Sequence, residues 1–288
     1  MSSVSALDIC ANCGKGEEES GKLQKCAACN LVKYCSRECQ AAHRPQHKKA
    51  CKKRASEIYD EKLFKEGERD ECPICMLPCP IGSHQTFESC CGKLICNGCV
   101  YAMKASEGGG DLYPCAFCRT PPASSYEENI KRLNKLMNKG NGEAFATLGG
   151  SYADGDLGLP QDDHKANELY LKAGELGSHN GYYNLGVSYD IGKGVEVDKK
   201  KAKHYYELAA MMGSVSARHN LGIMELKVGN HHRALKHYTI AAKAGNKGSL
   251  SAVKVGFMSG FVTKEEYANT QRAYQKAQDD MKSDMRDE

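Results

Sequence analysis

All 16 cysteines of this 288-residue chain lie between Cys10 and Cys118, and the last 170 residues (288 minus 118) contain none. Residues 1–9 lack the basic and apolar regions of a secretory signal, so we expect a reducing compartment, the cytoplasm or the nucleus. Disulfides are therefore not expected to explain the cysteines, and metal binding becomes the leading explanation. The break in composition near residue 120 and the chain length predict roughly two domains or more.

The first cysteine block contains four short ligand pairs separated by two or three residues. Their side chains supply seven sulfurs and one imidazole, enough for two tetrahedral zinc sites. The pairs are Cys10 and Cys13, Cys26 and Cys29, Cys35 and Cys39, and His47 and Cys51. About fifty residues with few bulky apolar side chains cannot build a large core, so zinc binding must supply folding free energy here.

The segment YCSRECQAAHRPQHKKAC, residues 34–51, together with the pairs before it, resembles the MYND zinc finger. The resemblance implies interleaved zinc sites, one held by Cys10, Cys13, Cys35 and Cys39 and the other by Cys26, Cys29, His47 and Cys51. His43 is an alternative ligand, but His47 has the expected spacing to Cys51. Closed structural sites of this kind do no chemistry. The family instead recognises proteins, typically proline-containing peptides, on a surface around the helix that carries Gln40 and Arg44.

The second block again offers eight ligands for two zinc ions and leaves only Cys79 over. The eight are Cys72, Cys75, Cys90, Cys91, Cys96, Cys99, Cys115 and Cys118. The stretches CPIC, CCGKLICNGC and CAFCR resemble a RING finger, the module through which many ubiquitin ligases bind a ubiquitin-conjugating enzyme. Lys93 stands where the common form has a histidine ligand, and Cys90 can replace it, as in all-cysteine variants. The resemblance then implies Cys72, Cys75, Cys96 and Cys99 on one zinc and Cys90, Cys91, Cys115 and Cys118 on the other, with Cys79 as an alternative ligand.

The RING resemblance also assigns a docking surface. It implies that Ile74, Met103 and Phe117 contact the conjugating enzyme, and that Arg119 orients the thioester-linked ubiquitin, which is catalysis by positioning. No residue of the module is expected to act covalently. Ala116 replaces the usual proline, and Ile74 and Arg119 could equally be a packing residue and a solvated charge, so an inactive RING-like spacer is the alternative.

After a linker and lead-in helix in residues 120–139, the chain is helical and repeats with a period of 32 to 37 residues. Leu-Gly pairs recur at Leu148, Leu185 and Leu221, and a glycine closes each unit at Gly177, Gly213 and Gly245. Each unit predicts two short helices that must stack on their neighbours to bury an apolar face. The units resemble Sel-one-like repeats, relatives of the tetratricopeptide repeat. A degenerate fourth unit around residues 246–277 precedes a charged tail, and the tyrosines and histidines of this region are expected to pack or to face solvent.

The sequence therefore predicts a mainly α protein: a MYND-type finger (10–51), a RING-type finger (72–119), a linker and lead-in helix (120–139), a Sel-one-like solenoid (140–277) and a charged tail (278–288). This combination resembles RING-type domain proteins of algae and protists. The predicted function is a ubiquitin ligase or ligase subunit with four zinc ions, whose repeats or MYND finger hold a protein substrate. The alternative is a non-enzymatic adaptor. A net charge of +4 and one basic run, residues 48–54, give little support to nucleic-acid binding, and no apolar run is long enough for membrane insertion.

Overall fold

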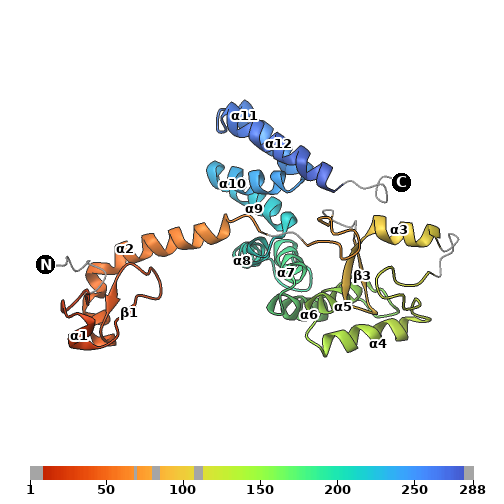
Figure 1. Cartoon of the computed structure of the whole chain (residues 1–288), viewed down its shortest axis with the longest axis horizontal. Helices are drawn as coiled ribbons and strands as arrows, with labels where there is room; N and C mark the ends of the chain where they lie inside the picture. Colours follow the sequence, from red (N-terminus) through yellow and green to blue (C-terminus); the bar gives the residue numbers. More distant parts are fainter. Residues whose placement is uncertain (1–8, 68–69, 80–84, 107–112, 282–288) are drawn as a thin grey trace. The chain divides into compact units, whose positions relative to one another are not determined.

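The structure of the protein is a computed structural model that describes residues 9–67, 70–79, 85–106 and 113–281. The chain divides into two units, residues 1–65 and residues 66–288, which are described separately. Most of the secondary structure in both units is helical, as Figure 1 shows.

The first unit combines a small antiparallel ribbon with one long helix. Strand β1 (Gln24–Lys25) pairs with β2 (Lys33–Tyr34), α1 (Glu17–Ser20) precedes them, and α2 (Arg37–Leu63) follows. The side chain of Ser36 caps α2 by accepting a hydrogen bond from the backbone N–H of Cys39 at 3.2 Å. The apolar core is small and contains three cysteines of the first block together with Leu23 and Tyr34. Such a core leaves metal binding as the principal source of stability.

The second unit begins with the second cysteine block, which folds around a hairpin and a helix. Strands β3 (Gln85–Glu88) and β4 (Lys93–Cys96) are antiparallel, with Gln85 opposite Cys96, and α3 (Asn97–Ser106) follows directly. Ile95 is fully buried at the centre of this module, in a cluster with Val100 and five cysteines.

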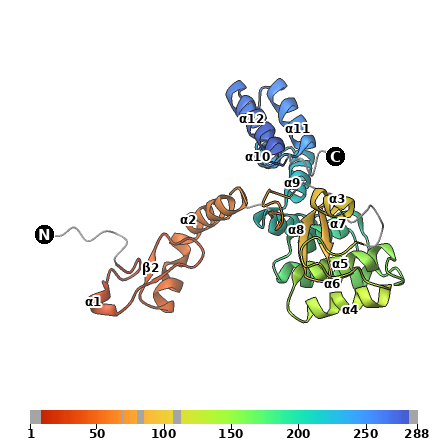
Figure 2. The same cartoon turned by 45° about the vertical axis from the view of Figure 1, so that its right-hand side comes forward.

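The rest of the second unit is an all-α array in which each helix packs on its neighbours in sequence, as Figures 1 and 2 show. The lead-in helix is α4 (Tyr126–Met137). It is followed by α5 (Gly142–Asp154), α6 (Asp163–Glu175), α7 (His179–Ile191), α8 (Lys199–Met211), α9 (Val215–Lys227), α10 (His231–Lys243), α11 (Lys247–Met258) and α12 (Lys264–Asp280). The predicted fold class, a mainly α chain with cysteine-rich fingers and an α solenoid, is confirmed.

The recurring Leu-Gly pairs are explained by close packing between the two helices of each repeat. A Cβ atom at Gly149 would lie 2.8 Å from the ring of Tyr170, and one at Gly186 would lie 2.6 Å from the ring of Tyr206. Gly222 and Tyr238 repeat the arrangement in the third unit, at 2.5 Å. Each glycine therefore leaves the volume that a buried tyrosine ring fills, which confirms core packing for these tyrosines.

The glycines that close the units lie in the turns from the second helix of one repeat to the first helix of the next. Gly177, Gly213 and Gly245 have φ angles of 94°, 99° and 101°, which favour glycine because a Cβ atom would clash with the backbone. A side-chain cap follows each of them, from Ser178, Ser214 and Asn246 in turn. The turns are thus built alike in three successive repeats.

The second cysteine module packs on the start of the solenoid. The side-chain amide of Asn141 donates a hydrogen bond to the carbonyl oxygen of Gly92 at 3.3 Å. Phe87 of β3 joins the apolar cluster formed by Leu133 of α4 and Ala144 of α5. This module and the first repeat therefore share a core, although the sequence predicts separate domains. Among the described helices, none is both long and apolar enough to cross a membrane.

Candidate metal centres and docking surfaces

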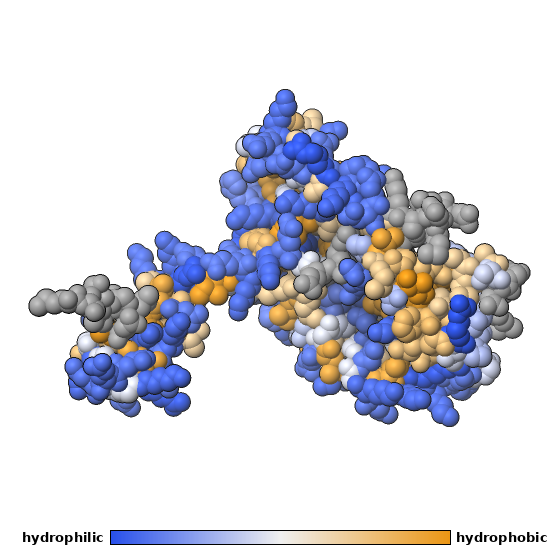
Figure 3. Space-filling model, viewed as in Figure 1, coloured by the Kyte–Doolittle hydropathy of each residue, from blue (hydrophilic) through white to orange (hydrophobic). Residues whose placement is uncertain are grey.

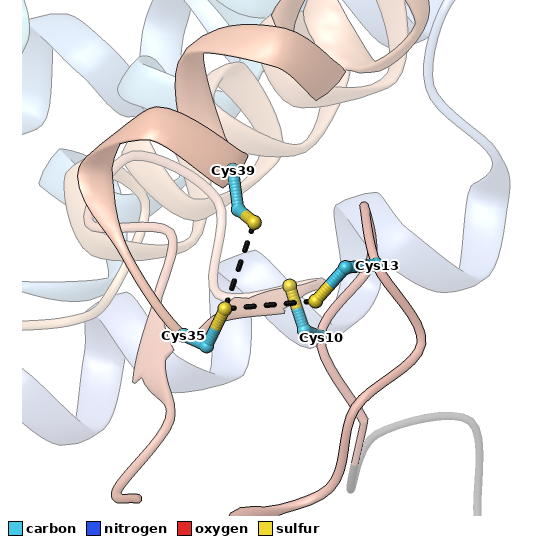
Figure 4. A group of neighbouring side chains, drawn as sticks. All are labelled: Cys10, Cys13, Cys35 and Cys39. Carbon is cyan, nitrogen blue, oxygen red and sulfur yellow. Dashed lines mark hydrogen bonds between the residues drawn. The ribbon is translucent and has the colours of Figure 1, made fainter. Parts of the chain in front are cut away.

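The first metal-competent cluster lies where the ribbon of the first unit meets the start of α2. The Sγ atoms of Cys10, Cys13, Cys35 and Cys39 all lie within 4.8 Å of one another, and Figure 4 shows them pointing toward a common centre. The Sγ atom of Cys35 lies 3.6 Å from those of Cys13 and Cys39. A tetrahedral zinc ion with Zn–S bonds of about 2.3 Å separates its sulfur ligands by about 3.8 Å. The cluster therefore fits zinc.

The second cluster combines three cysteines with the imidazole of His47. Cys26, Cys29, His47 and Cys51 again place one ligand atom each within 4.8 Å of the others. The Nε2 atom of His47 lies 3.2 Å from Sγ of Cys29, and the Sγ atoms of Cys26 and Cys51 are 3.8 Å apart. Helix α2 provides His47 and Cys51 one turn apart, so its first half contributes ligands to both clusters.

The electrostatics of these thiols also favour a bound cation. Burial alone raises the pKa of Cys10, but hydrogen bonds from the backbone of Cys13 and Cys35 outweigh it and lower the pKa to about 6. Cys35 shows the opposite shift, since hydrogen bonds with the thiols of Cys39 and Cys10 raise its pKa to about 12. Cys10 is thus easily deprotonated, and deprotonation of the neighbouring thiol of Cys35 is disfavoured. A divalent cation removes that conflict, because it favours the thiolate form of every ligand.

Two further clusters lie in the second cysteine block, and their ligands alternate along the chain. Cys72, Cys75, Cys96 and Cys99 form one group, and Cys90, Cys91, Cys115 and Cys118 form the other, each within 4.8 Å. In the second group, the Sγ atoms of Cys90 and Cys118 are 3.4 Å apart and those of Cys91 and Cys115 are 3.9 Å apart. The first and third ligand pairs therefore converge on one centre and the second and fourth on another.

The thiols of the second block likewise have pKa values shifted in opposite directions. Burial raises the pKa of Cys72, but backbone hydrogen bonds from Cys75 and Cys96 bring it down to about 7. Burial and the neighbouring thiols raise the pKa of Cys90 and Cys99. With the two clusters of the MYND-like segment, the structure thus offers four cysteine-rich sites whose donors fit zinc.

The two alternative ligands lie outside these clusters. Cys79 is buried in the core of the second block, where its backbone N–H donates to the carbonyl oxygen of Asp70 at 2.7 Å. The Nδ1 atom of His43 lies 3.1 Å from the hydroxyl of Tyr34, and its ring stacks on that of His47. Among the described residues, the metal-competent groups also contain no histidine of the solenoid.

The predicted docking residues lie around the clusters of the second block. Ile74 and Phe117 are 37% and 44% exposed, unusual values for large apolar side chains beside a small core. Met76 and Tyr101, which the sequence analysis did not single out, are exposed to 70% and 64%. Figure 3 shows apolar residues gathered on the face over β3 and α3.

The remaining docking residues are brought together by one contact. A guanidinium nitrogen of Arg119 lies 2.8 Å from the thioether sulfur of Met103, although sixteen residues separate them. Arg119 has a left-handed backbone, with φ of 60°, directly after the last cysteine. The ammonium of Lys93 lies 5.9 Å from the ring centre of Phe117. A cation in that position is attracted by the ring face.

A pocket of about 340 Å³ opens beside α2 in the first unit, and three ligands of the second cluster, Cys26, His47 and Cys51, form part of its lining. Tyr34 and three alanines give it an apolar lining, and it contains both Gln40 and Arg44, around which the sequence placed a peptide surface. Lys48 and Lys52, which were not predicted as part of a peptide surface, line the same pocket. The spacing of these residues could have predicted this, because positions 40, 44, 48 and 52 are four apart and therefore share one helix face.

Comparison with known proteins identifies two of the modules. Residues 10–51 match the MYND finger family model, and residues 148–178, 179–214 and 215–246 match the Sel1 repeat model. A 50-residue segment is 42% identical to the SET domain and MYND-type zinc finger protein 6 of Schizosaccharomyces pombe. That match covers 17% of this chain and only 10% of the fission-yeast protein.

Two solved structures are similar to part of this chain. A Sel1 repeat protein from Oxalobacter formigenes is 26% identical, with a TM-score of 0.45, and the match covers 52% of this chain and 64% of that one. A protective antigen of uropathogenic Escherichia coli strains, with an SLR fold, is 27% identical, with a TM-score of 0.48, over 56% of this chain and 35% of that one. From the family models, the chain carries an N-terminal MYND zinc finger and C-terminal Sel1 repeats, both protein-interaction modules.

Proposed function

We propose that the second cysteine block is an all-cysteine RING-type finger and that the protein is a ubiquitin ligase or ligase subunit. The observation that carries this proposal is the alternation of its two four-sulfur clusters along the chain, beside exposed Ile74 and Phe117. In this proposal the chain holds four zinc ions through the sixteen ligands named above. The ions supply folding free energy and hold the loops that carry the docking residues.

The proposed mechanism is positioning. Ile74, Met103 and Phe117 form the apolar contact for a ubiquitin-conjugating enzyme, and Arg119 donates hydrogen bonds that hold the thioester-linked ubiquitin in a reactive geometry. The contact between a guanidinium nitrogen of Arg119 and the Met103 sulfur supports this arrangement, because it brings a proposed positioning residue next to a proposed docking residue. A substrate amine then attacks the thioester carbonyl, an amide bond to ubiquitin forms, and the C–S bond breaks to release the cysteine thiol of the conjugating enzyme, which takes up the proton that the amine loses. No group of the finger reacts covalently.

The packing of this module on the first repeat supports two roles within the second unit, binding of the conjugating enzyme by the finger and binding of the substrate by the repeats. Because Asn141 and the Phe87 cluster join the module to α4 and α5, the bound conjugating enzyme would be held in a fixed direction relative to the repeats. A protein substrate on the Sel1 repeats would then present a restricted set of lysines. We propose the cytoplasm or nucleus as the location, where the cysteines would stay reduced.

A single-turnover discharge assay tests the role of Arg119. Ubiquitin preloaded on a conjugating enzyme is mixed with zinc-loaded protein, and thioester loss to free lysine is followed. Arg119→Ala should slow the discharge at least ~10-fold, which corresponds to about 1.4 kcal/mol, while Arg272→Ala, a matched change of an exposed arginine of α12, should leave it unchanged. Equal rates for wild type and Arg119→Ala would remove the positioning role.

The second candidate function is a non-enzymatic adaptor, and the pocket beside α2 favours it. Its volume of about 340 Å³ and its apolar floor suit a proline-containing peptide segment. Binding to a panel of such peptides should weaken in Gln40→Ala, which removes a lining side chain. Gln46→Ala, on the same helix but outside the pocket, is the matched control, and equal effects of the two changes would exclude this pocket.

A further inference from the structure

The turns between successive repeats are occupied by another part of the same chain. Three of them connect α6 to α7, α8 to α9 and α10 to α11, at residues 176–178, 212–214 and 244–246. Equivalent positions of stacked repeats form a row along one edge of a solenoid. We name this row, with the helix ends that flank it, the turn row.

Residues that precede the second cysteine block contact the turn row once in each repeat. The Asp70 carboxylate lies 3.0 Å from Nε2 of His179, the first residue of α7. The backbone of Gly67 lies against Gly213, so closely that a Cβ atom at Gly67 would lie 2.7 Å from the Cα atom of Gly213. The Glu66 carboxylate lies 3.1 Å from Nζ of Lys243, the last residue of α10.

The spacing of these contacts matches the repeat. Three residues of an extended chain span about 10 Å, and Gly67 and Asp70 are three positions apart in the sequence. Packed helices lie about 8–10 Å apart, so an extended segment meets a new turn roughly every three residues. Glu66 is only one residue from Gly67, and its long side chain and that of Lys243 together span the distance to the end of α10. The spacing of the turns is therefore compatible with an extended segment that contacts one turn in each repeat.

The chemistry of the contacts is specific. The solenoid contributes the cations Lys243 and Arg218 and the imidazole of His179, and the segment contributes the carboxylates of Glu66 and Asp70. Arg218 is only 2% exposed, and the Glu66 charge favours its charged form against the effect of burial. The close approach of Gly67 to Gly213 excludes a side chain at the position directly after the first carboxylate. The pattern recognised is acidic, then glycine, then acidic three positions later.

The segment does not fill the space that it covers. A cavity of about 150 Å³ remains between Glu66 and Gly67 on one side and Val215, Arg218 and Ile240 on the other. A peptide that carried the same charges and an additional small apolar side chain would bury more of that surface. The chain's own segment is thus a partial match to the turn row.

We propose that the turn row is a binding track for an extended acidic peptide of a partner protein, and that Glu66, Gly67 and Asp70 occupy it within the chain. A partner segment with the acidic–glycine–acidic pattern binds by displacing them. The inference concerns partner capture by the repeats and does not depend on ubiquitin ligase activity.

The test uses the full zinc-loaded chain and a labelled peptide with the sequence of residues 62–71, KLFKEGERDE. Fluorescence anisotropy is measured with wild type and with the double variant Glu66→Ala/Asp70→Ala, which removes the internal carboxylates. The double variant should bind the peptide at least ~5-fold more tightly than wild type. A peptide with lysine at both acidic positions, KLFKKGERKE, should bind at least ~10-fold more weakly to the double variant.

Two further changes in the background of the double variant locate the site. Lys243→Glu should abolish peptide binding, whereas Lys254→Glu, a charge reversal at an exposed lysine of α11, should not. Zinc content and the far-ultraviolet circular dichroism of each variant establish that it is folded. Equal binding of the two peptides, or no binding by the folded double variant, would overturn the proposal.

Discussion

A Cβ atom added to Gly149 would lie 2.8 Å from the ring of Tyr170, whereas one added to the next residue, Gly150, would have only the Tyr170 hydroxyl within 4.0 Å. Both glycines lie in α5, so they share a backbone conformation and differ in what they face. Substitution of each glycine by alanine can therefore distinguish two effects of glycine in a helix. One is the space it leaves for a neighbouring side chain, and the other is the conformational entropy that the chain loses on folding.

Gly149→Ala should therefore destabilise the solenoid by about 1–3 kcal/mol, the usual cost of overpacking a core. Gly150→Ala should be neutral or stabilise it by up to about 1 kcal/mol, because alanine favours the helix. Urea unfolding followed by circular dichroism measures both. A loss of stability in Gly150→Ala as large as that in Gly149→Ala would contradict the packing account of the Leu-Gly pairs.

Zinc stoichiometry separates the alternative ligands of the second block. Cys90→Ser should lower the zinc content from about four ions per chain to about three, because it removes a donor from a four-sulfur cluster. Cys79→Ser should leave it unchanged, since Cys79 lies outside the clusters. Inductively coupled plasma mass spectrometry of gel-filtered protein gives the ratio. Four ions in the Cys90 variant and three in the Cys79 variant would reverse the assignment.

A buried histidine of α10 should make the solenoid sensitive to mild acid. Burial and the nearby positive charges of Arg218 and Arg233 lower the pKa of His237 to about 3. Between pH 7 and pH 5 the unfolded chain therefore binds a proton there, near an ordinary pKa of about 6.5, while the folded chain does not, so acidification favours unfolding. The loss amounts to about 2 kcal/mol over this range. In His237→Gln the decline in unfolding free energy from pH 7 to pH 5 should be smaller by that amount, and an undiminished decline would contradict the argument.

A buried carboxylate is a second group that makes the solenoid sensitive to acid. Glu225 of α9 is buried, and although burial opposes ionisation, hydrogen bonds and charge attraction from Lys203, with help from Asn230 and Arg233, keep the pKa of its carboxyl low. Its stabilisation is complete above the ordinary pKa of about 4.3 and disappears as pH falls through the lower folded value. Glu225→Gln should cost about 2–3 kcal/mol at pH 7, because charged hydrogen bonds are lost. No loss at pH 7 would exclude this network as a source of stability.

The sequence predicted the elements that follow from short-range spacing. Ligand pairs two or three residues apart lie on one knuckle, so their clustering could be predicted, and the Leu-Gly register followed from the repeat period. The shorter third unit is explained by the loop of residues 228–230, which replaces the longer loop of residues 192–198 in the second.

Contacts between distant segments could not be predicted in the same way. The pairing of Asp70 with His179 spans 109 residues, and neither residue belongs to a spacing pattern that would identify the other. The packing of Phe87 on α4 and α5 likewise depends on which face of the finger remains apolar after its metal sites form. These contacts come from tertiary packing, about which a local pattern carries no information.

The most direct test of the proposed ligase function is autoubiquitination of the full chain against a panel of conjugating enzymes, with zinc quantified on the same sample. Wild type should form ubiquitin conjugates with at least one enzyme, and Ile74→Ala, which truncates an exposed side chain and leaves the zinc content intact, should lose most of this activity. Absence of conjugates across the panel from protein that holds four zinc ions would contradict a ligase and favour an adaptor.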